Sequence, residues 1–127
     1  IPVYNEYEGL RQTLREMESI LSEAHLEIIL VNDGSDSYTV SILEEVKAKD
    51  ITILHHPVNR GYGAALKTGL SKARYNYVGI TDADGTYPNE RIPDLIKTFE
   101  EGGFDMVVGS RTGGNVNIPG AKSYKLK

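Results

Sequence analysis

The feature that most constrains the fold is an alternation of short apolar runs with segments of helical periodicity. Apolar runs of strand length occupy residues 26–31, 51–54, 77–81 and 104–108. The spacing of apolar residues between these runs predicts helices over residues 6–24, around 40–46, over 64–73 and around 95–99. Nearly continuous apolar strands separated by helices are typical of a mainly parallel sheet with helices on both faces. The sequence therefore predicts a Rossmann-like α/β fold.

A length of 127 residues suits one domain, because a chain of this size buries roughly two-thirds of its unfolded surface. We expect residues 1–127 to form that single domain. Residues 1–3 look like the end of a strand already under way, so we expect the domain to be truncated at its amino-terminal end. We expect truncation at the carboxyl-terminal end as well. Asn5 is expected to cap the first helix, with Glu8 completing a capping box. The absence of cysteine excludes a disulfide scaffold, a zinc finger and a thiol nucleophile.

Charge is distributed unevenly along the chain. Residues 1–110 carry 18 acidic and 10 basic side chains, whereas residues 111–127 carry four basic side chains and no acidic one. A basic segment of this kind indicates either a phosphate-bearing partner or membrane surface, or an ordinary solvated segment. The acidic remainder shows no stripe of basic and aromatic residues, which argues against nucleic acid as a partner.

Polar or glycine-rich residues follow every predicted strand. Ligands of open α/β sheets bind at the carboxyl ends of the strands, so these positions are candidate site residues. Asp82 and Asp84 directly follow one apolar run, and side chains at i and i+2 of an extended chain point the same way. Two adjacent carboxylates without a neighbouring histidine or cysteine suit Mg²⁺ or Mn²⁺. The alternative is a turn whose aspartates cap the next helix.

Three further motifs allow a ligand-binding and a structural interpretation. Asp33 lies just after another apolar run, where its carboxylate could accept hydrogen bonds from a nucleobase, although the sequence DGSD also suits a turn. Gly61 and Gly63 suggest a dinucleotide-binding fingerprint, but the third glycine is replaced by Leu66, so a tight turn is the better interpretation. His55 and His56 point to opposite faces of a strand, which predicts one packed and one exposed histidine.

The ordered set of motifs carries a resemblance that no single motif does. It consists of IPVYNE (1–6), VNDGSDS (31–37), NRGYGAALKTG (59–69), TDADGTYP (81–88) and VVGSR (107–111). In order and spacing this set resembles glycosyltransferase family 2 with its GT-A fold, and within it the dolichyl or polyprenyl phosphate sugar transferases. The resemblance implies an inverting transferase that uses a nucleotide-sugar donor, a UDP- or GDP-sugar, and a divalent cation, Mg²⁺ or Mn²⁺.

The resemblance also implies a role for individual residues. Pro2, Tyr4 and Glu6 would enclose the base and ribose, Asp33 would contact the base, and Gly61 would let the backbone approach the nucleotide. Asp82 and Asp84 would form the metal-binding DxD pair, with Asp84 the more direct ligand, and Asp82 would also contact the nucleotide. Arg111 would hold a phosphate of the donor or acceptor. Two departures from the family pattern are Thr86, where a glutamine is common, and Asn32, where an aspartate is common.

The same resemblance favours polyprenyl phosphate as the acceptor. A hydroxyl acceptor would need a general base, and no acidic residue follows Asp105, whereas a phosphate is already an anion. Arg111 and the basic residues beyond 120 would then face a membrane surface, which implies a cytoplasmic protein at the cytoplasmic face of a membrane.

Two alternatives remain open at this point. The sequence DADGT also fits the phosphatases of the haloacid dehalogenase type, in which Asp82 would be the nucleophile and Asp84 the acid/base. Three predicted strand–helix units precede the motif here, which disfavours that interpretation. The chain could also be a nucleotide-binding fragment without turnover.

Overall fold

The computed structural model describes residues 1–21, 26–46 and 50–110. The chain divides into two compact units, Ile1–Pro93 and Asp94–Lys127. The first unit contains β1 (Pro2–Val3), α1 (Glu8–Leu21), β2 (Ile28–Asp33), α2 (Ser37–Glu44), β3 (Ile51–His56), α3 (Tyr62–Leu70) and the 3₁₀ helix η1 (Asn89–Arg91). Helix α4 (Ile92–Gly102) begins at the end of the first unit and continues into the second.

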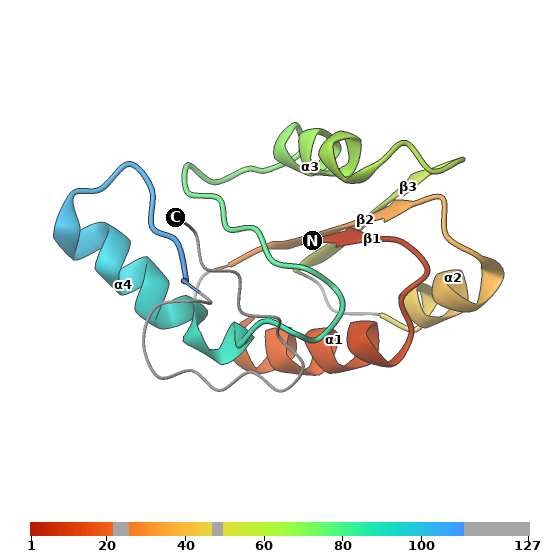
Figure 1. Ribbon diagram of the computed structural model, residues 1–127, viewed down its shortest axis with the longest axis horizontal. Coiled ribbons are helices and arrows are strands. Elements are labelled where there is room, and N and C mark those ends of the chain that lie inside the picture. Colours follow the sequence, from red (N-terminus) through yellow and green to blue (C-terminus); the bar gives the residue numbers. More distant parts are fainter. Residues whose placement is uncertain (22–25, 47–49, 111–127) are drawn as a thin grey trace, which may run out of the picture. The chain divides into compact units, whose positions relative to one another are not determined.

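The strands of the first unit form a parallel sheet in the order β1-β2-β3 (Figure 1). Val3 pairs with Asn32, and Asp33 pairs with His56. Because the strands are parallel, their carboxyl ends lie at one edge of the sheet. The residues that follow β1, β2 and β3 are therefore brought to that edge.

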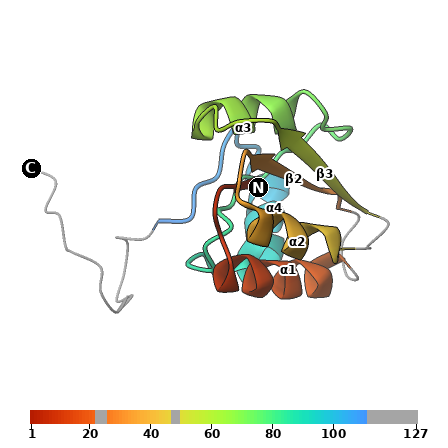
Figure 2. The same ribbon diagram turned by 90° about the vertical axis from the view of Figure 1, so that its right-hand side faces the viewer.

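Helices cover both faces of this sheet. Figure 2 shows α3 on one face and α1 with α2 on the other. Strand β2 alternates between the two layers: Leu30 belongs to the core cluster formed with α1 and α2, whereas a Cβ atom added at Gly69 of α3 would lie 3.4 Å from the side chain of Val31. The predicted α/β fold with helices on both faces is confirmed, and it is consistent with a GT-A fold.

The apolar stripe of α1 explains why this helix forms and where it packs. Leu10, Leu14, Met17 and Ile20 recur at helical spacing and are all buried in the core. Full burial of one such side chain contributes about 1.5–3 kcal/mol, so most of the helix's stability comes from packing against the sheet. Shortening Leu10 to alanine would cost about 2–5 kcal/mol.

The prediction that Asn5 caps α1 is wrong. The helix begins at Glu8, and Asn5 has a left-handed backbone with φ of 50°. The Asn5 side-chain oxygen instead accepts from the backbone N–H of Asp36 at 2.9 Å, and Asp36 in turn caps α2 by accepting from the N–H of Thr39. Asparagine tolerates the left-handed conformation, so it can link the β1–α1 turn to the β2–α2 turn.

Two predicted strands are not present in the described residues. Residues 77–81 and 104–108 adopt no strand pairing, and the side chains of Tyr77, Val78, Ile80, Phe104, Met106 and Val108 are more than half exposed. An apolar, β-branched run reports suitability for a sheet but does not supply a pairing partner. Gly79 and Gly109, inside and directly after these runs, further weaken any strand.

Helix α4 has apolar residues at helical spacing, but none of its residues is buried.

Across the part of the chain that the structure describes, no helix combines the length and apolar character needed to cross a bilayer.

Candidate functional site

A cavity of about 310 Å³ lies at the carboxyl-terminal edge of the sheet, within the unit Ile1–Pro93. It is lined by Pro2, Val3, Tyr4, Glu6, Asp33, Asn59, Tyr62, Ala65, Asp82, Ala83 and Asp84. Six of the residues singled out in the sequence are therefore brought together here: Pro2, Tyr4, Glu6, Asp33, Asp82 and Asp84. Gly61 does not line the cavity, and Arg111 lies outside the described residues.

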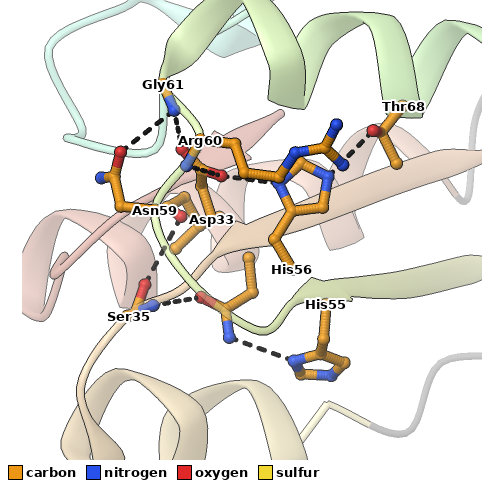
Figure 3. A network of polar contacts seen from close by, with 10 residues as sticks. Asp33, Ser35, His55, His56, Asn59, Arg60, Gly61 and Thr68 are labelled. Carbon is orange, nitrogen blue, oxygen red and sulfur yellow. Dashed lines mark hydrogen bonds and ion pairs between the residues drawn. The ribbon is translucent and has the colours of Figure 1, made fainter.

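Asp33 is the most enclosed carboxylate of the cavity. Its residue is 3% exposed, and its Oδ1 accepts from the backbone N–H of Arg60 at 2.9 Å, while its Oδ2 accepts from the N–H of Gly61 at 2.8 Å (Figure 3). Burial alone would raise the pKa of Asp33. Hydrogen bonds from His56 and from these two N–H groups outweigh it and hold the pKa below its ordinary value of 3.8. Asp33 is therefore an anion held rigidly by the protein.

The neighbouring histidines separate as predicted. His56 is 7% exposed and lies on the α3 side of the sheet, where Nδ1 contacts Asp33 Oδ1 at 2.6 Å and Nε2 contacts Thr68 Oγ1 at 2.9 Å. His55 is exposed and contacts the side-chain amide of Asn32 at 3.0 Å.

Two glycines allow the backbone to close tightly around Asp33. Gly34 has φ of 71°, and a Cβ atom there would collide with the backbone of Val58 and Asn59. Gly61 has φ of 89° and begins α3 as its N-cap. Only glycine adopts these conformations without strain, which explains why both turns contain it. The Gly61 N–H donates to Asp33. The expected contact between Gly61 and a nucleotide stays a prediction.

Asp82 and Asp84 enter the cavity from a segment without regular secondary structure. Asp82 Oδ1 accepts from the hydroxyl of Tyr62 at 3.0 Å. Burial first, and then this hydrogen bond, raise the pKa of Tyr62, so the phenol remains a donor. Asp84 Oδ1 accepts from both the N–H and the hydroxyl of Thr86, at 3.0 and 2.7 Å. A carboxylate has about four acceptor positions, so both aspartates keep capacity for a further ligand.

Helix α1 supports this segment from below. A Cβ atom at Gly9 would lie 2.5 Å from the carbonyl oxygen of Asp84, so a glycine is required for the two backbones to approach. Asn89 is 2% exposed; its amide oxygen accepts from the hydroxyl of Thr81 at 2.7 Å, and its amide nitrogen donates to Glu16 at 2.8 Å. The positions of Asp82 and Asp84 thus depend on α1 and not on a strand.

The donor set of the cavity suits a hard divalent cation. Asp82 and Asp84 offer carboxylate oxygens, which Mg²⁺ and Mn²⁺ prefer. Among the residues that the structure describes, no three acidic or histidine side chains are arranged to hold a metal ion by themselves. A cation at this position would therefore take its other ligands from a bound phosphate or from water, as Mg²⁺ sites commonly do.

Glu6 adds a further carboxylate to the rim of the cavity. Burial, and then the nearby charge of Asp84, raise the pKa of Glu6 above its ordinary value of 4.5. The carboxylates of Glu6 and Asp84 therefore repel each other on this side of the cavity. A cation bound there would relieve this repulsion.

Several residues that build the site were not predicted from the sequence. Tyr62 and Asn59 line the cavity, and Gly9, Asn89 and His56 hold its walls. Gly9 had one usable signal, because a glycine in the first turn of a strongly amphipathic helix calls for a close contact. The pairing of Asn89 with Glu16 spans 73 residues and has no local signal.

Comparison with known proteins identifies the family. The chain matches the family model described as glycosyl transferase family 2 over residues 1–126. The chain belongs to glycosyl transferase family 2. The resemblance carried by the ordered motifs is confirmed, and this membership removes the basis for the phosphatase alternative.

Curated relatives extend this family assignment. The chain is 42% identical over 116 residues to the undecaprenyl-phosphate 4-deoxy-4-formamido-L-arabinose transferase of Proteus mirabilis, covering 87% of this chain and 35% of that protein. It is 31% identical over 112 residues to the dolichol-phosphate mannosyltransferase of Pyrococcus furiosus, covering 87% of this chain and 32% of that protein. The chain thus spans about a third of the length of these family 2 relatives.

Proposed function

We propose that this chain is the donor-binding part of an inverting, metal-dependent glycosyltransferase that moves a sugar from a nucleoside diphosphate to polyprenyl phosphate. The observation that carries the proposal is the convergence of Asp33, Asp82 and Asp84 on one cavity at the carboxyl ends of the strands. Open α/β sheets bind ligands at this edge. Family 2 membership supports the transferase activity.

The nucleoside would occupy the side of the cavity formed by β1 and β2. Tyr4 is 50% exposed at the cavity and offers an aromatic face for a base. Pro2 borders the same space, Asp33 would accept a hydrogen bond from the base, and Glu6 would reach the ribose hydroxyls. Either uracil or guanine carries an N–H group that an ionised Asp33 could bind.

The diphosphate would lie toward Asp82 and Asp84. These two residues would hold Mg²⁺ or Mn²⁺, which when bound neutralises the charge that builds up on the leaving diphosphate. Thr86 holds Asp84 by two hydrogen bonds, and Tyr62 holds Asp82 by one, so both carboxylates are oriented before a ligand arrives. The proposed role of Arg111 is to bind a phosphate of the donor or acceptor.

The acceptor proposal rests on chemistry and on the relatives. Two similar proteins are named as undecaprenyl-phosphate and dolichol-phosphate transferases. A polyprenyl phosphate oxygen is already anionic, so its attack on the anomeric carbon needs no general base, and Arg111 would pair with its charge. Residues beyond 120 would then lie at a membrane surface, on its cytoplasmic face.

Calorimetric titration tests the donor site directly. UDP and GDP are each titrated, with and without Mn²⁺, into the chain and into its Asp84→Asn and Asp50→Asn variants. Asp50 is an exposed carboxylate just before β3, at the amino-terminal edge of the sheet and about 20 Å along the strand from its carboxyl end. We expect one nucleotide to bind with Mn²⁺, an affinity at least about tenfold weaker in Asp84→Asn, and no change in Asp50→Asn.

Folded protein that binds neither nucleotide would contradict the proposal. Equal loss in Asp84→Asn and Asp50→Asn would show that the effect is nonspecific charge. Binding without transfer, when the chain is assayed with radiolabelled donor and polyprenyl phosphate, would favour a nucleotide-binding module without turnover.

A further inference from the structure

A buried series of hydrogen bonds runs beside the cavity and is not explained by the proposed chemistry. It begins at Thr68 on α3, passes through His56 on β3 and reaches Asp33 on β2 (Figure 3). From Asp33 it continues to the backbone N–H groups of the 59–61 turn. The side chains of His56 and Asp33 are 5% and 4% exposed. Burial of this many polar groups is costly unless each has a partner, and here each does.

The protonation pattern of the series follows from its acceptor. Asp33 is ionised and can only accept, so Nδ1 of His56 carries the proton and donates to it. Thr68 can then donate its hydroxyl proton to Nε2 of a neutral imidazole or accept from an imidazolium. The hydroxyl therefore satisfies His56 in either state, and the orientation of the imidazole is fixed.

The order hydroxyl, imidazole and carboxylate is also found in hydrolase triads, but the placement here does not suit catalysis. Neither Thr68 nor His56 lines the cavity. Of the three side chains Thr68, His56 and Asp33, Asp33 alone borders it. Thr68 and His56 can therefore influence a bound ligand only through Asp33.

The orientation of the Asp33 carboxylate affects both the 59–61 turn and the cavity. Within the residues that the structure describes, Oδ1 of Asp33 receives two hydrogen bonds, from His56 and Arg60, whereas Oδ2 receives one, from Gly61. The carboxylate also lies at the start of α3, where the helix dipole favours an anion. Rotation of the carboxylate would release the backbone N–H groups of Arg60 and Gly61, next to Asn59 of the cavity lining, and would reorient the Asp33 oxygens relative to the cavity.

We propose that His56 and Thr68 are positioning residues for nucleobase recognition: by fixing the Asp33 carboxylate they hold one of its oxygens toward the N–H edge of the base. This inference rests on the proposed nucleotide site. It goes beyond that site by assigning a recognition role to two residues that do not touch the ligand.

The test compares a nucleotide with an analogue that lacks the recognised proton. UDP is paired with its N3-methyl analogue, or GDP with its N1-methyl analogue, according to which parent binds. Calorimetric affinities with Mn²⁺ are measured for the chain and for His56→Leu, His56→Asn and Thr68→Val. The asparagine amide can place a donor near the former Nδ1, so it is the conservative control.

We expect the parent nucleotide to bind at least about tenfold more tightly than its methylated analogue in the unchanged chain, since a hydrogen bond to a charged group is at stake. His56→Leu should abolish most of this preference, Thr68→Val should reduce it, and His56→Asn should retain most of it. The affinity for the methylated analogue should change little in any variant.

Other outcomes overturn the inference. If the parent and methylated nucleotides weaken equally in His56→Leu, the histidine supports the fold but not base recognition. If His56→Leu does not fold by circular dichroism, Thr68→Val decides, and an unchanged preference there rejects the inference. If the unchanged chain binds neither nucleotide, the proposed function itself is contradicted. This result can be told apart from a failure of the inference, because it is obtained without any variant.

Discussion

The cavity receives its carboxylates from two regions that are built differently. Asp33 ends a paired strand, is almost fully buried and accepts hydrogen bonds from a side chain and two backbone N–H groups. Asp82 and Asp84 lie on an irregular segment, are more exposed, and accept from the side chains of Tyr62 and Thr86. The first region is part of the sheet, whereas the second is held by contacts with α1.

The difference separates two tasks that one site must perform. A rigid carboxylate in a preformed network can select a ligand by geometry, because it does not rearrange on binding. A partly exposed pair of carboxylates keeps acceptor positions available for a cation that would in turn bind a diphosphate. The proposed division is therefore base recognition at Asp33 and metal binding at Asp82 and Asp84, and the following predictions test it.

The largest expected effect is a loss of stability, and we expect it when Asp33 is replaced but not when Asp84 is replaced. Asp33→Ala leaves His56 and two backbone N–H groups without their acceptor, so we expect a loss of about 3–5 kcal/mol in the free energy of unfolding. Asp84→Ala removes an exposed acceptor of Thr86 and should cost less than about 1 kcal/mol. Urea unfolding followed by circular dichroism measures both.

Similar losses in the two variants would contradict this comparison. Asp50→Ala provides the control for removing an exposed aspartate. If Asp33→Ala is too unstable to measure, Asp33→Asn should show a smaller loss of the same sign.

A glycine supports each region, and alanine at the two positions should have opposite consequences. Gly34→Ala forces a side chain into a left-handed conformation and against the backbone of Val58, so we expect a loss of about 2 kcal/mol in stability. Gly9→Ala improves helix propensity by up to about 1 kcal/mol but displaces the carbonyl of Asp84. We therefore expect nearly unchanged stability with reduced Mn²⁺-dependent nucleotide binding, measured by unfolding and calorimetry on the same samples.

If Gly9→Ala kept full Mn²⁺-dependent binding, the segment that carries Asp84 would not depend on α1. Gly63→Ala is a suitable control, because a Cβ atom at Gly63 meets no atom within 4 Å.

The buried amide of Asn89 gives a smaller test of the same support. Asn89→Leu leaves the hydroxyl of Thr81 and one oxygen of Glu16 without a partner, so we expect a loss of about 1–3 kcal/mol. Thr81→Val combined with Asn89→Leu should cost less than the sum of the two single changes, because the pair then leaves no unpaired hydroxyl. A double-mutant cycle from urea unfolding measures this coupling, and strict additivity would show that the two groups act independently.

Local signals in the sequence were enough for the first region but not for the second. The apolar run of β2 and the glycine after Asp33 predict a strand that delivers a carboxylate to the sheet edge, and the structure agrees. The run at residues 77–81 has the same local character, yet it pairs with no strand in the described part of the chain, since pairing depends on partners far away in the sequence. Asn89 and Glu16 show the same limit: their contact is set by tertiary packing, for which one sequence carries no periodic signal.

The smallest expected effect concerns proton binding, where Glu6 and Asp33 respond in opposite directions. The pKa of Glu6 is raised in the fold, so its contribution to stability is present below its ordinary value of 4.5 and is lost as the pH rises through the higher folded pKa. The pKa of Asp33 is lowered, so its contribution is present above its ordinary value of 3.8 and is lost as the pH falls through the lower folded pKa.

Asp84→Asn should distinguish the two carboxylates. It removes the like charge near Glu6, so the pKa of Glu6 should fall toward 4.5 but stay above it, because burial is the larger cause of the shift. The pKa of Asp33 should not change, since His56 and backbone N–H groups set it. Carboxyl ¹³C NMR titration reads both groups in one experiment. A shift of Asp33 as large as that of Glu6 would mean that the two regions are electrostatically coupled, and base recognition could then not be separated from metal binding.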